Sequence, residues 1–254
     1  MDYGLIGGRL GHSYSKEIHE KLADYTYELC PLSENEFAPF MEKHDFKAIN
    51  VTIPYKQRVI PYLLKMDKKA EKIGAVNCIV NRNGELYGYN TDYDGFAYML
   101  DKHNVEVARK KILVIGNGGA AQAVKACLND RKCREIVIVR RGKDDEAVTY
   151  DEVYAEHTDV DIIVNTSPVG MYPDVDESPI DLKPFKKCTD VIDLIYNPAE
   201  TLLTAQAKKR GMLGVTGLEM LIAQAKVAVE IFLDTDISDD VIETIYQNMK
   251  RLIN

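Results

Sequence analysis

Three polar side chains with complementary chemistry fall close together in the segment Asn50-Val51-Thr52-Ile53-Pro54-Tyr55-Lys56. Asn50 and Thr52 are two residues apart, so on an extended strand they point to the same face. Pro54 has no N–H to give to a sheet, so the strand ends there and Lys56 follows where the chain turns. An amide, a hydroxyl and an ammonium in one patch suit a compact substrate with several hydroxyl groups. An edge strand followed by a solvated lysine fits the same pattern equally well.

A glycine-rich turn in the second half of the chain has the spacing of a dinucleotide-binding loop. Gly116-Asn117-Gly118-Gly119-Ala120-Ala121 fits G-x-G-x-x-A, directly after the apolar run 112–115 and directly before a helical pattern. Gly116 permits the tight turn, Gly118 lets a pyrophosphate approach the backbone, and Ala121 allows close helix–strand packing. The helix N-terminus offers its unpaired N–H groups to the phosphates. The alternative is a glycine-rich turn without a ligand.

The end of the next strand favours NADP over NAD. An NAD site has an Asp or Glu about 20 residues beyond the glycines, where it binds the ribose hydroxyls. This chain has Val139-Arg140-Arg141-Gly142-Lys143 instead. Arg140 and Arg141 can fork onto a 2′-phosphate, so NADP is the expected cofactor. Two solvated surface arginines are the alternative.

Composition excludes several other classes of protein. The 32 basic and 40 acidic side chains give a net charge of −8, which disfavours nucleic acid and anionic membranes as partners. No apolar run approaches the ~20 residues of a membrane span, and the chain enters a strand within its first residues, without room for a signal peptide. The histidines lack metal-ligand spacing, so no metal is expected. The cysteines are odd in number and scattered, which favours reduced thiols and a cytoplasmic location: Cys30, Cys78, Cys127, Cys133 and Cys188.

Hydrophobic runs and helical patterns alternate along the chain, which is typical of an α/β protein with mainly parallel sheets. Strands are expected at 3–7, 48–53, 76–80, 85–89, 112–115, 135–139, 161–165, 191–196 and 212–215. Helices are expected at 15–23, 67–73, 94–103, 121–128, 201–210 and 217–233, followed by a last helix capped by Ser238. A domain boundary is expected near Asn104, with the final helices returning to the first domain. The expected domains are 1–103 plus 217–254, and 104–216.

Eight segments, taken in order, resemble the shikimate dehydrogenase family over nearly the whole chain. They are Gly11-His12-Ser13-Tyr14-Ser15, Asn50–Lys56, Gly74-Ala75-Val76-Asn77, Asn90-Thr91-Asp92, Gly116–Ala121, Asn165-Thr166-Ser167-Pro168-Val169-Gly170-Met171, Tyr196 and Gly217–Gln224. The resemblance implies an N-terminal α/β substrate-binding domain and a Rossmann-like NADP-binding domain. It also implies NADPH-dependent reduction of 3-dehydroshikimate to shikimate, in the synthesis of chorismate and aromatic amino acids. The implied partner is this small-molecule substrate, with a monomer or a homodimer both left open.

The resemblance also implies roles for individual residues. Ser13 and Ser15 would bind the substrate carboxylate, although the alternative for both is simple helix capping, and Ser15 could do both. Tyr196 would lie near that carboxylate, where the two domains face each other. The ring hydroxyls would be bound by Asn50, Thr52, Asn77 and Gln224, although Asn77 could instead be a turn residue. Beside the cofactor, the resemblance places the glycine loop, Arg140, Arg141, Thr166 and Gly217. Gly217 would be a glycine because a side chain there would obstruct the nicotinamide, and valine there should slow turnover without unfolding the protein.

Lys56 and Asp92 form the expected catalytic pair. Hydride arrival at a ketone leaves a developing alkoxide, which needs a positive charge and a proton. A lysine ammonium can supply both, while Asp92 holds it and binds a substrate hydroxyl. Asp92 could instead only cap the helix that follows it. His12 is a weaker candidate for a general base.

Three departures from the family pattern, and three rival functions, accompany this interpretation. Family members usually have Asn-Arg-Thr where Val139-Arg140-Arg141 stands. Lys16 replaces a proline that is frequent in the family. The segment 143–149 is too short for the usual helix, so one Rossmann helix should be missing. A quinate or dual quinate/shikimate dehydrogenase is the nearest rival. A non-catalytic NADP-binding sensor and a folate-linked dehydrogenase are more distant ones.

Overall fold

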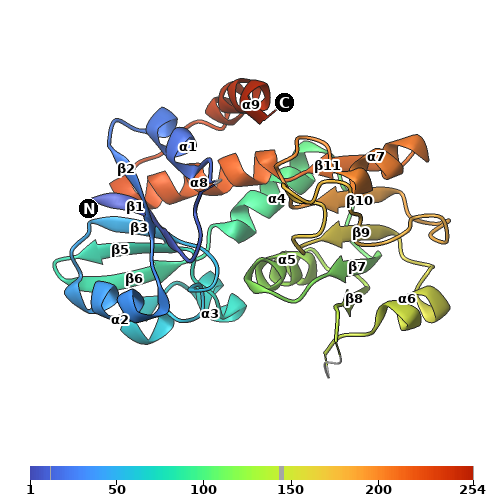
Figure 1. The fold of residues 1–254 in the computed structure, drawn as a ribbon, viewed down its shortest axis with the longest axis horizontal. Helices are drawn as coiled ribbons and strands as arrows, with labels where there is room; N and C mark the ends of the chain where they lie inside the picture. The colour runs from blue at the N-terminus through green and yellow to red at the C-terminus, as the bar shows by residue number, and fades with distance from the viewer. Residues whose placement is uncertain (12, 143–145, 254) are drawn as a thin grey trace. The chain divides into compact units, whose positions relative to one another are not determined.

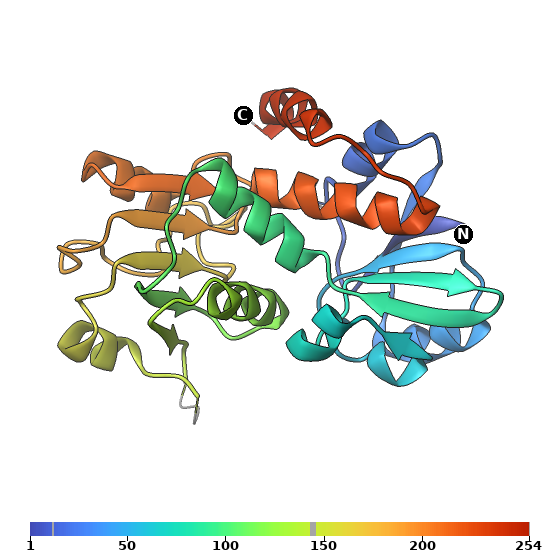
Figure 2. The ribbon, with the colours of Figure 1, turned by 180° about the vertical axis from the view of Figure 1, so that it is seen from behind.

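The structure is a computed structural model that describes residues 1–11, 13–142 and 146–253. It is an α/β protein with two sheets, which Figures 1 and 2 show from opposite sides. The chain divides into two compact units. The first unit contains Met1–Phe96 and Leu221–Ile245, and the second contains Ala97–Met220 and Tyr246–Asn254. Each unit is built around one of the sheets.

The sheet of the first unit has six strands in the order β2-β1-β3-β5-β6-β4. Their bounds are β1 Tyr3–Gly7, β2 Tyr27–Pro31, β3 Ala48–Val51, β4 Lys65–Met66, β5 Cys78–Arg82 and β6 Glu85–Tyr89. β1 runs parallel to both β2 and β3, whereas β5 is antiparallel to β3 and β6. The β5–β6 hairpin turns through Asn83 and Gly84, both of which have positive φ, as the tightest hairpin turns require. The expected hairpin is therefore confirmed.

Helices cover both faces of this sheet (Figure 1). They are α1 Ser15–Leu22, α2 Glu34–Lys43, α3 Lys68–Ile73, a 3₁₀ turn at Ile60–Tyr62, and α8 Leu218–Leu233, whose later residues belong to this unit. On one face, Ile49 and Val51 pack with Phe37 and Met41 of α2. Because successive strand residues point to opposite faces, Ala48 packs on the other face, with Tyr27 of β2 and with Ala228 and Phe232 of α8.

The sheet of the second unit has five parallel strands in the order β11-β10-β9-β7-β8. Its strands are β7 Lys111–Ile115, β8 Glu135–Val139, β9 Ile162–Asn165, β10 Asp190–Asp193 and β11 Leu213–Thr216. The remaining helices are α4 Asp92–Lys102, α5 Gly119–Asp130, α6 Tyr150–Glu156, α7 Leu202–Lys209 and α9 Asp240–Ile253. From β7 the chain goes to β8 on one side and later to β9 on the other. This reversal of strand order is the point at which open parallel sheets bind ligands, at the carboxyl ends of the strands.

Several details differ from expectation. β2 and α2 were not expected at all. The predicted loss of a Rossmann helix is wrong, because α6 connects β8 to β9 just beyond the short segment. Ser15 is the first residue of α1 and not its cap, a position that Tyr14 occupies. The strand expected at 48–53 is shorter than expected, because β3 ends at Val51. Among the described residues no helix is long and apolar enough to cross a membrane.

A buried carboxyl group lies at the end of β10. Asp193 is fully buried, with its oxygens accepting from Asn165 Nδ2 at 2.9 Å, Thr201 Oγ1 at 2.7 Å and the Ile195 N–H at 3.1 Å. Burial nevertheless raises the pKa of this carboxyl to about 6, because the charged form loses its hydration. Asp193 therefore ties β10 to β9 and to the start of α7, and its charge opposes folding at neutral pH.

We expect Asp193→Asn to stabilise the protein at neutral pH relative to acidic pH. Unfolded, the carboxyl titrates near its ordinary pKa of 3.8, so the folded state holds the proton more tightly. The Asp193 carboxyl therefore contributes its full stabilisation below about pH 4, where it is protonated, and this contribution is lost as the pH rises through 6. The difference between the two pKa values corresponds to at most roughly 3 kcal/mol. Urea unfolding at pH 4 and 7.5 gives the free energy of unfolding of both proteins. The difference between Asp193→Asn and the unmodified protein should shift in favour of the variant by up to this amount from pH 4 to pH 7.5. A difference that does not change with pH would contradict the effect of burial.

Candidate active site

Lys56 and Asp92 form an ion pair that is largely removed from solvent. Lys56 Nζ lies 2.6 Å from Asp92 Oδ2, and the two side chains are only 13% and 11% exposed. The main chain of Lys56 is fixed because its carbonyl accepts from the Val76 N–H at 2.8 Å. Asp92 is the first residue of α4, where the helix dipole favours a negative charge. The pair offers one ammonium held in a defined direction.

The second oxygen of Asp92 is bound by Asn77. Asn77 Nδ2 donates to Asp92 Oδ1 at 2.9 Å and also lies 3.0 Å from Thr91 Oγ1. Asn77 Oδ1 accepts from the Thr91 N–H at 2.7 Å, which fixes the orientation of its amide. Both carboxylate oxygens of Asp92 are therefore held, one by Lys56 and the other by Asn77.

Gln224 joins this network from α8. Its Oε1 lies 3.3 Å from Thr91 Oγ1 and 3.5 Å from Asn77 Nδ2, while its Nε2 donates to the Leu221 carbonyl at 2.8 Å. From the sequence, Thr91 has no expected role beyond its place in the segment Asn90-Thr91-Asp92. Its place directly before Asp92, an expected catalytic residue, was the only indication in the sequence.

Asn50 and Thr52 lie at the end of β3. Asn50 is 5% exposed, and its Nδ2 donates to the Asn77 carbonyl at 3.1 Å. Its Oδ1 accepts from the hydroxyl of Tyr27 at 2.8 Å. Thr52 lies just beyond the strand, and its methyl group packs against Gly7, where a Cβ would come within 2.5 Å of it. Asn50 thus extends the network, whereas the Thr52 side chain makes no hydrogen bond to it among the described residues.

The two serines form a separate pair at the start of α1. Ser13 Oγ lies 3.1 Å from Ser15 Oγ and accepts from the Ser15 N–H at 3.3 Å. The structure therefore brings Lys56, Asp92, Asn77, Gln224 and Asn50 into one network, and the serines into a hydroxyl pair of the same unit. His12 lies outside the described residues.

The glycine loop of the second unit has an open position above α5. Gly116 has φ of 101°, and a Cβ there would lie 2.8 Å from Thr166 Oγ1. Thr166 follows β9 and donates from its Oγ1 to the Ile115 carbonyl at 2.8 Å, so it closes the turn from the neighbouring strand. Gly118 precedes α5, and a Cβ there would meet nothing within 4 Å. The space over Gly118, at a helix N-terminus, fits the approach of a pyrophosphate.

Arg140 and Arg141 follow β8, the strand beside β7, and both are exposed. Arg140 Nε donates to the Arg141 carbonyl at 3.4 Å. Parallel strands end at one edge of the sheet, so the arginines and the glycine loop share that edge. Both arginines are therefore exposed at the edge of the sheet where the glycine loop lies.

Tyr196 and Gly217 also belong to the second unit. Tyr196 follows β10 and is half-buried. The Gly217 N–H donates to the Ile195 carbonyl at 2.9 Å, and a Cβ there would come within 2.1 Å of the Leu194 carbonyl oxygen. The expectation that valine at 217 leaves the fold undisturbed is therefore wrong, because backbone packing already requires glycine.

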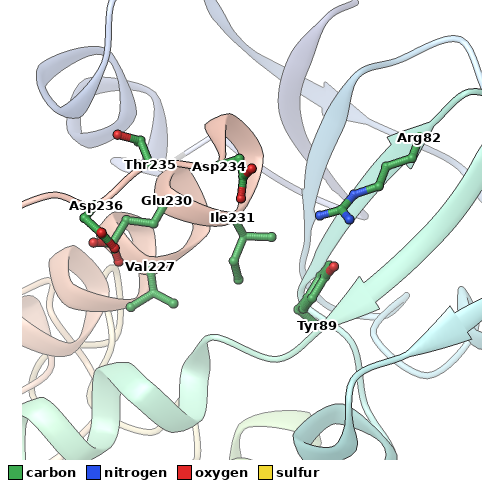
Figure 3. A pocket seen from close by; sticks show the side chains of 8 residues that line it. All are labelled: Arg82, Tyr89, Val227, Glu230, Ile231, Asp234, Thr235 and Asp236. Carbon is green, nitrogen blue, oxygen red and sulfur yellow. The ribbon is translucent and has the colours of Figure 1, made fainter.

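A separate pocket of about 380 Å³ lies in the first unit. Figure 3 shows the side chains that line it. Its walls are Arg82, Tyr89, Val227, Glu230, Ile231, Asp234, Thr235 and Asp236. None of the expected site residues lines it. Among the described residues, no three His, Cys, Asp or Glu side chains are grouped so that they could hold a metal ion.

Known proteins identify the family of this chain. Residues 5–79 match the family model of the shikimate dehydrogenase substrate binding domain. Shikimate dehydrogenase (NADP(+)) of Clostridium perfringens is 36% identical over 266 residues, covering 98% of each chain. The structure of a chorismate mutase/shikimate 5-dehydrogenase fusion protein from Clostridium acetobutylicum is 38% identical, with a TM-score of 0.91 over 99% of this chain and 97% of that one. Shikimate 5-dehydrogenase from Thermus thermophilus, solved with NADP(H) and shikimate, is 25% identical with a TM-score of 0.86 over 98% and 99%.

The relative and the two solved structures each cover 98–99% of the chain and therefore include both units. They confirm the fold class expected from the sequence, and they agree with the resemblance that the eight segments indicated. With 36% identity over 98% of its residues to an NADP-dependent relative, the chain belongs to the shikimate dehydrogenase family of oxidoreductases.

Proposed function

We propose that this protein catalyses the reversible NADPH-dependent reduction of 3-dehydroshikimate to shikimate, a step towards chorismate and the aromatic amino acids. The observation that carries the proposal is the largely buried Lys56–Asp92 pair, held at 2.6 Å in a chain of this family. A non-catalytic sensor would have no need to retain an ammonium and a carboxylate locked together out of water.

The proposed chemistry uses Lys56 as acid and Asp92 as its partner. NADPH, when held by the second unit, would supply a hydride for the carbonyl carbon of the substrate. As the carbonyl oxygen gains negative charge, the Lys56 ammonium stabilises it and donates a proton, which leaves a neutral amine that water reprotonates. Asp92 holds Nζ in place and accepts a hydrogen bond from a neighbouring substrate hydroxyl. In the oxidative direction the same lysine, as the neutral amine, removes the proton from the hydroxyl.

The remaining substrate contacts are proposed from residues of the first unit. The hydroxyls of Ser13 and Ser15 bind the carboxylate, a role that suits two O–H donors 3.1 Å apart. The amide groups of Asn50 and Gln224, with the Thr52 hydroxyl, bind ring hydroxyls. Asn77 contributes chiefly by holding Asp92, since its amide N–H groups already have protein acceptors.

The cofactor contacts are proposed in the second unit. The loop Gly116–Ala121 takes the pyrophosphate over Gly118, and Arg140 with Arg141 binds the 2′-phosphate. Thr166 and Gly217 border the remaining part of the cofactor. We accordingly assign residues 1–103 and 217–254 to substrate binding and residues 104–216 to NADP binding; the match of residues 5–79 to a substrate-binding model supports the first part of this assignment.

One assay tests the proposed activity. Reduction of NADP is followed by absorbance with shikimate, and then with quinate or NAD substituted in turn. A clear preference for shikimate with NADP supports the proposal. Equal use of quinate would instead favour a dual-specificity enzyme, and activity with neither substrate would favour a sensor.

Lys56→Ala should lower kcat by orders of magnitude while KM for shikimate stays within a few-fold, because a group that acts in the transition state affects kcat. Asp92→Asn should also be slow, and its effect should be less than additive with Lys56→Ala. Lys69→Ala is the matched control, since it breaks another lysine–aspartate pair of 2.6 Å, with Asp94, that lies outside the network. Near-normal kcat in Lys56→Ala would overturn the assignment.

Replacing Arg140 and Arg141 together with alanine should raise KM for NADP much more than KM for NAD. Each lost charge-assisted hydrogen bond to a phosphate is worth roughly 1.5–3 kcal/mol, or about tenfold or more in affinity. Arg134→Ala is the control, because this residue precedes β8 and so lies at the opposite end of the same strand. Equal use of NAD and NADP by the unmodified protein would refute the arginine clamp.

Alanine at two glycines of the cofactor loop should have opposite consequences. Gly118→Ala should leave the melting temperature almost unchanged, with a cost of about 1 kcal/mol or less at a helix cap, yet raise KM for NADP strongly. Gly116→Ala should destabilise the free protein, because φ is 101° and Thr166 Oγ1 lies 2.8 Å from the new methyl group. Unchanged NADP affinity in Gly118→Ala would show that the pyrophosphate does not lie over this loop.

A further inference from the structure

We infer that Tyr27 is a positioning residue of the substrate site, which fixes the amide of Asn50 so that its remaining N–H faces the ligand. The inference rests on the proposed function, and it adds to the substrate site a residue from a strand that no motif of the sequence marked. Its basis is the hydrogen bond of 2.8 Å between the Tyr27 hydroxyl and Asn50 Oδ1, two fully or nearly fully buried side chains.

The arrangement of strands explains how Tyr27 reaches the site. Tyr27 is the first residue of β2, and β1 lies between β2 and β3. The tyrosine side chain therefore extends across β1 to meet Asn50 on β3. It does so on the face of the sheet that α8 covers, packed with Leu5 and Ala48. Only a long side chain with a polar end can make this contact.

The orientation of the Asn50 amide follows from its two partners. The atom of Asn50 that faces the Asn77 carbonyl at 3.1 Å must be Nδ2, because a carbonyl oxygen can only accept a hydrogen bond. The other end of the amide, facing Tyr27, is then Oδ1, and the tyrosine hydroxyl must donate to it. Burial raises the pKa of Tyr27 well above its ordinary value, so the hydroxyl keeps its proton throughout the working pH range.

The amide retains one donor after these bonds are made. Nδ2 has two hydrogens, and the Asn77 carbonyl takes one of them. Within the described part of the chain, no acceptor is found for the second, so it is available to a hydroxyl oxygen of the substrate. Without the Tyr27 hydroxyl, Oδ1 would be buried without its donor, and the amide would gain from turning away from this orientation.

The ring of Tyr27 is itself held in place. It stacks on the imidazole of His19 with centroids 4.0 Å apart and an angle of 15°. His19 Nδ1 lies 2.8 Å from the Tyr25 hydroxyl. Burial lowers the pKa of His19 to about 3, so the imidazole stays neutral and the stack does not change with pH near neutrality.

The test compares Tyr27→Phe with Tyr25→Phe in the full-length protein. Both variants remove one hydroxyl from the same aromatic stack, but only Tyr27→Phe takes a hydrogen bond from Asn50. Loss of one hydrogen bond to a buried polar group changes an equilibrium constant roughly tenfold. We expect KM for shikimate to rise by about that factor in Tyr27→Phe, with kcat within about twofold, since the contact serves binding in the ground state and transition state alike. Tyr25→Phe should keep both constants within about twofold.

A double-mutant cycle with Asn50→Ala separates positioning from general stability. If Tyr27 acts through Asn50, adding Tyr27→Phe to Asn50→Ala should change KM by less than about twofold. An equal KM in Tyr27→Phe and Tyr25→Phe, or a full effect of Tyr27→Phe in the Asn50→Ala background, overturns the inference. If Asn50→Ala does not fold, the comparison of the two tyrosine variants decides alone. Absence of shikimate oxidation by the unmodified protein would overturn the proposed function instead, so the two failures are distinguishable.

Discussion

The network of the first unit depends on the cost of taking a lysine–aspartate pair out of water. Lys56 and Asp92 are both nearly nine-tenths buried, and such a pair is stable only if its remaining hydrogen-bonding sites find partners. Asn77 satisfies the second carboxylate oxygen, and Thr91 in turn fixes the amide of Asn77. The side chains around the ion pair are held in fixed orientations, because an unsatisfied hydrogen-bonding group beside a buried charge is costly. The ammonium therefore keeps its direction before any ligand binds.

The sheet makes this network possible by bringing separate segments together. β3 and β5 are antiparallel neighbours, with Asn50 opposite Cys78, so the end of β3 lies beside the start of β5 and Asn77 just before it. β6 returns antiparallel to β5 and delivers Thr91 and Asp92 to the same place through the start of α4. Antiparallel pairing thus brings Asn77 and Asp92, at the two ends of one hairpin, beside the end of the neighbouring strand β3, which Lys56 follows.

The sequence predicted most of the strands and the glycine turn, but it missed the strands β2 and β4 and two helices, and for the helices the reason is identifiable. α2 contains Pro39, which argues against a helix when read by itself. Its start is nevertheless marked by Ser33 and Glu36, which form a capping box, as Thr149 and Glu152 do for α6. In both cases the glutamate side chain binds the N–H of the cap residue. The capping pattern was present in the sequence at both places. α2 forms despite Pro39, and α6 forms despite the short segment that precedes it.

The contact of Tyr27 with Asn50 could not be predicted from spacing. The two residues are 23 positions apart, and they meet only because the strand order is β2-β1-β3 and not the order of the sequence. Motif patterns are local, so they mark residues such as Lys56 and Asp92, whose neighbours in the chain are also distinctive. A residue that acts through another across an intervening strand leaves no such pattern.

The three glycines at the ends of the second sheet show that one residue type can be required for different physical reasons. Gly116 is needed for its positive φ and its closeness to Thr166, and Gly217 because the Leu194 backbone leaves no room for a Cβ. Gly118 has neither constraint: its φ is −83° and the space around it is open. A glycine that the protein's own packing does not require is best explained by something outside the chain. Of the three, Gly118 is therefore the one that the proposed pyrophosphate contact would explain, while Gly116 and Gly217 are required by the fold itself.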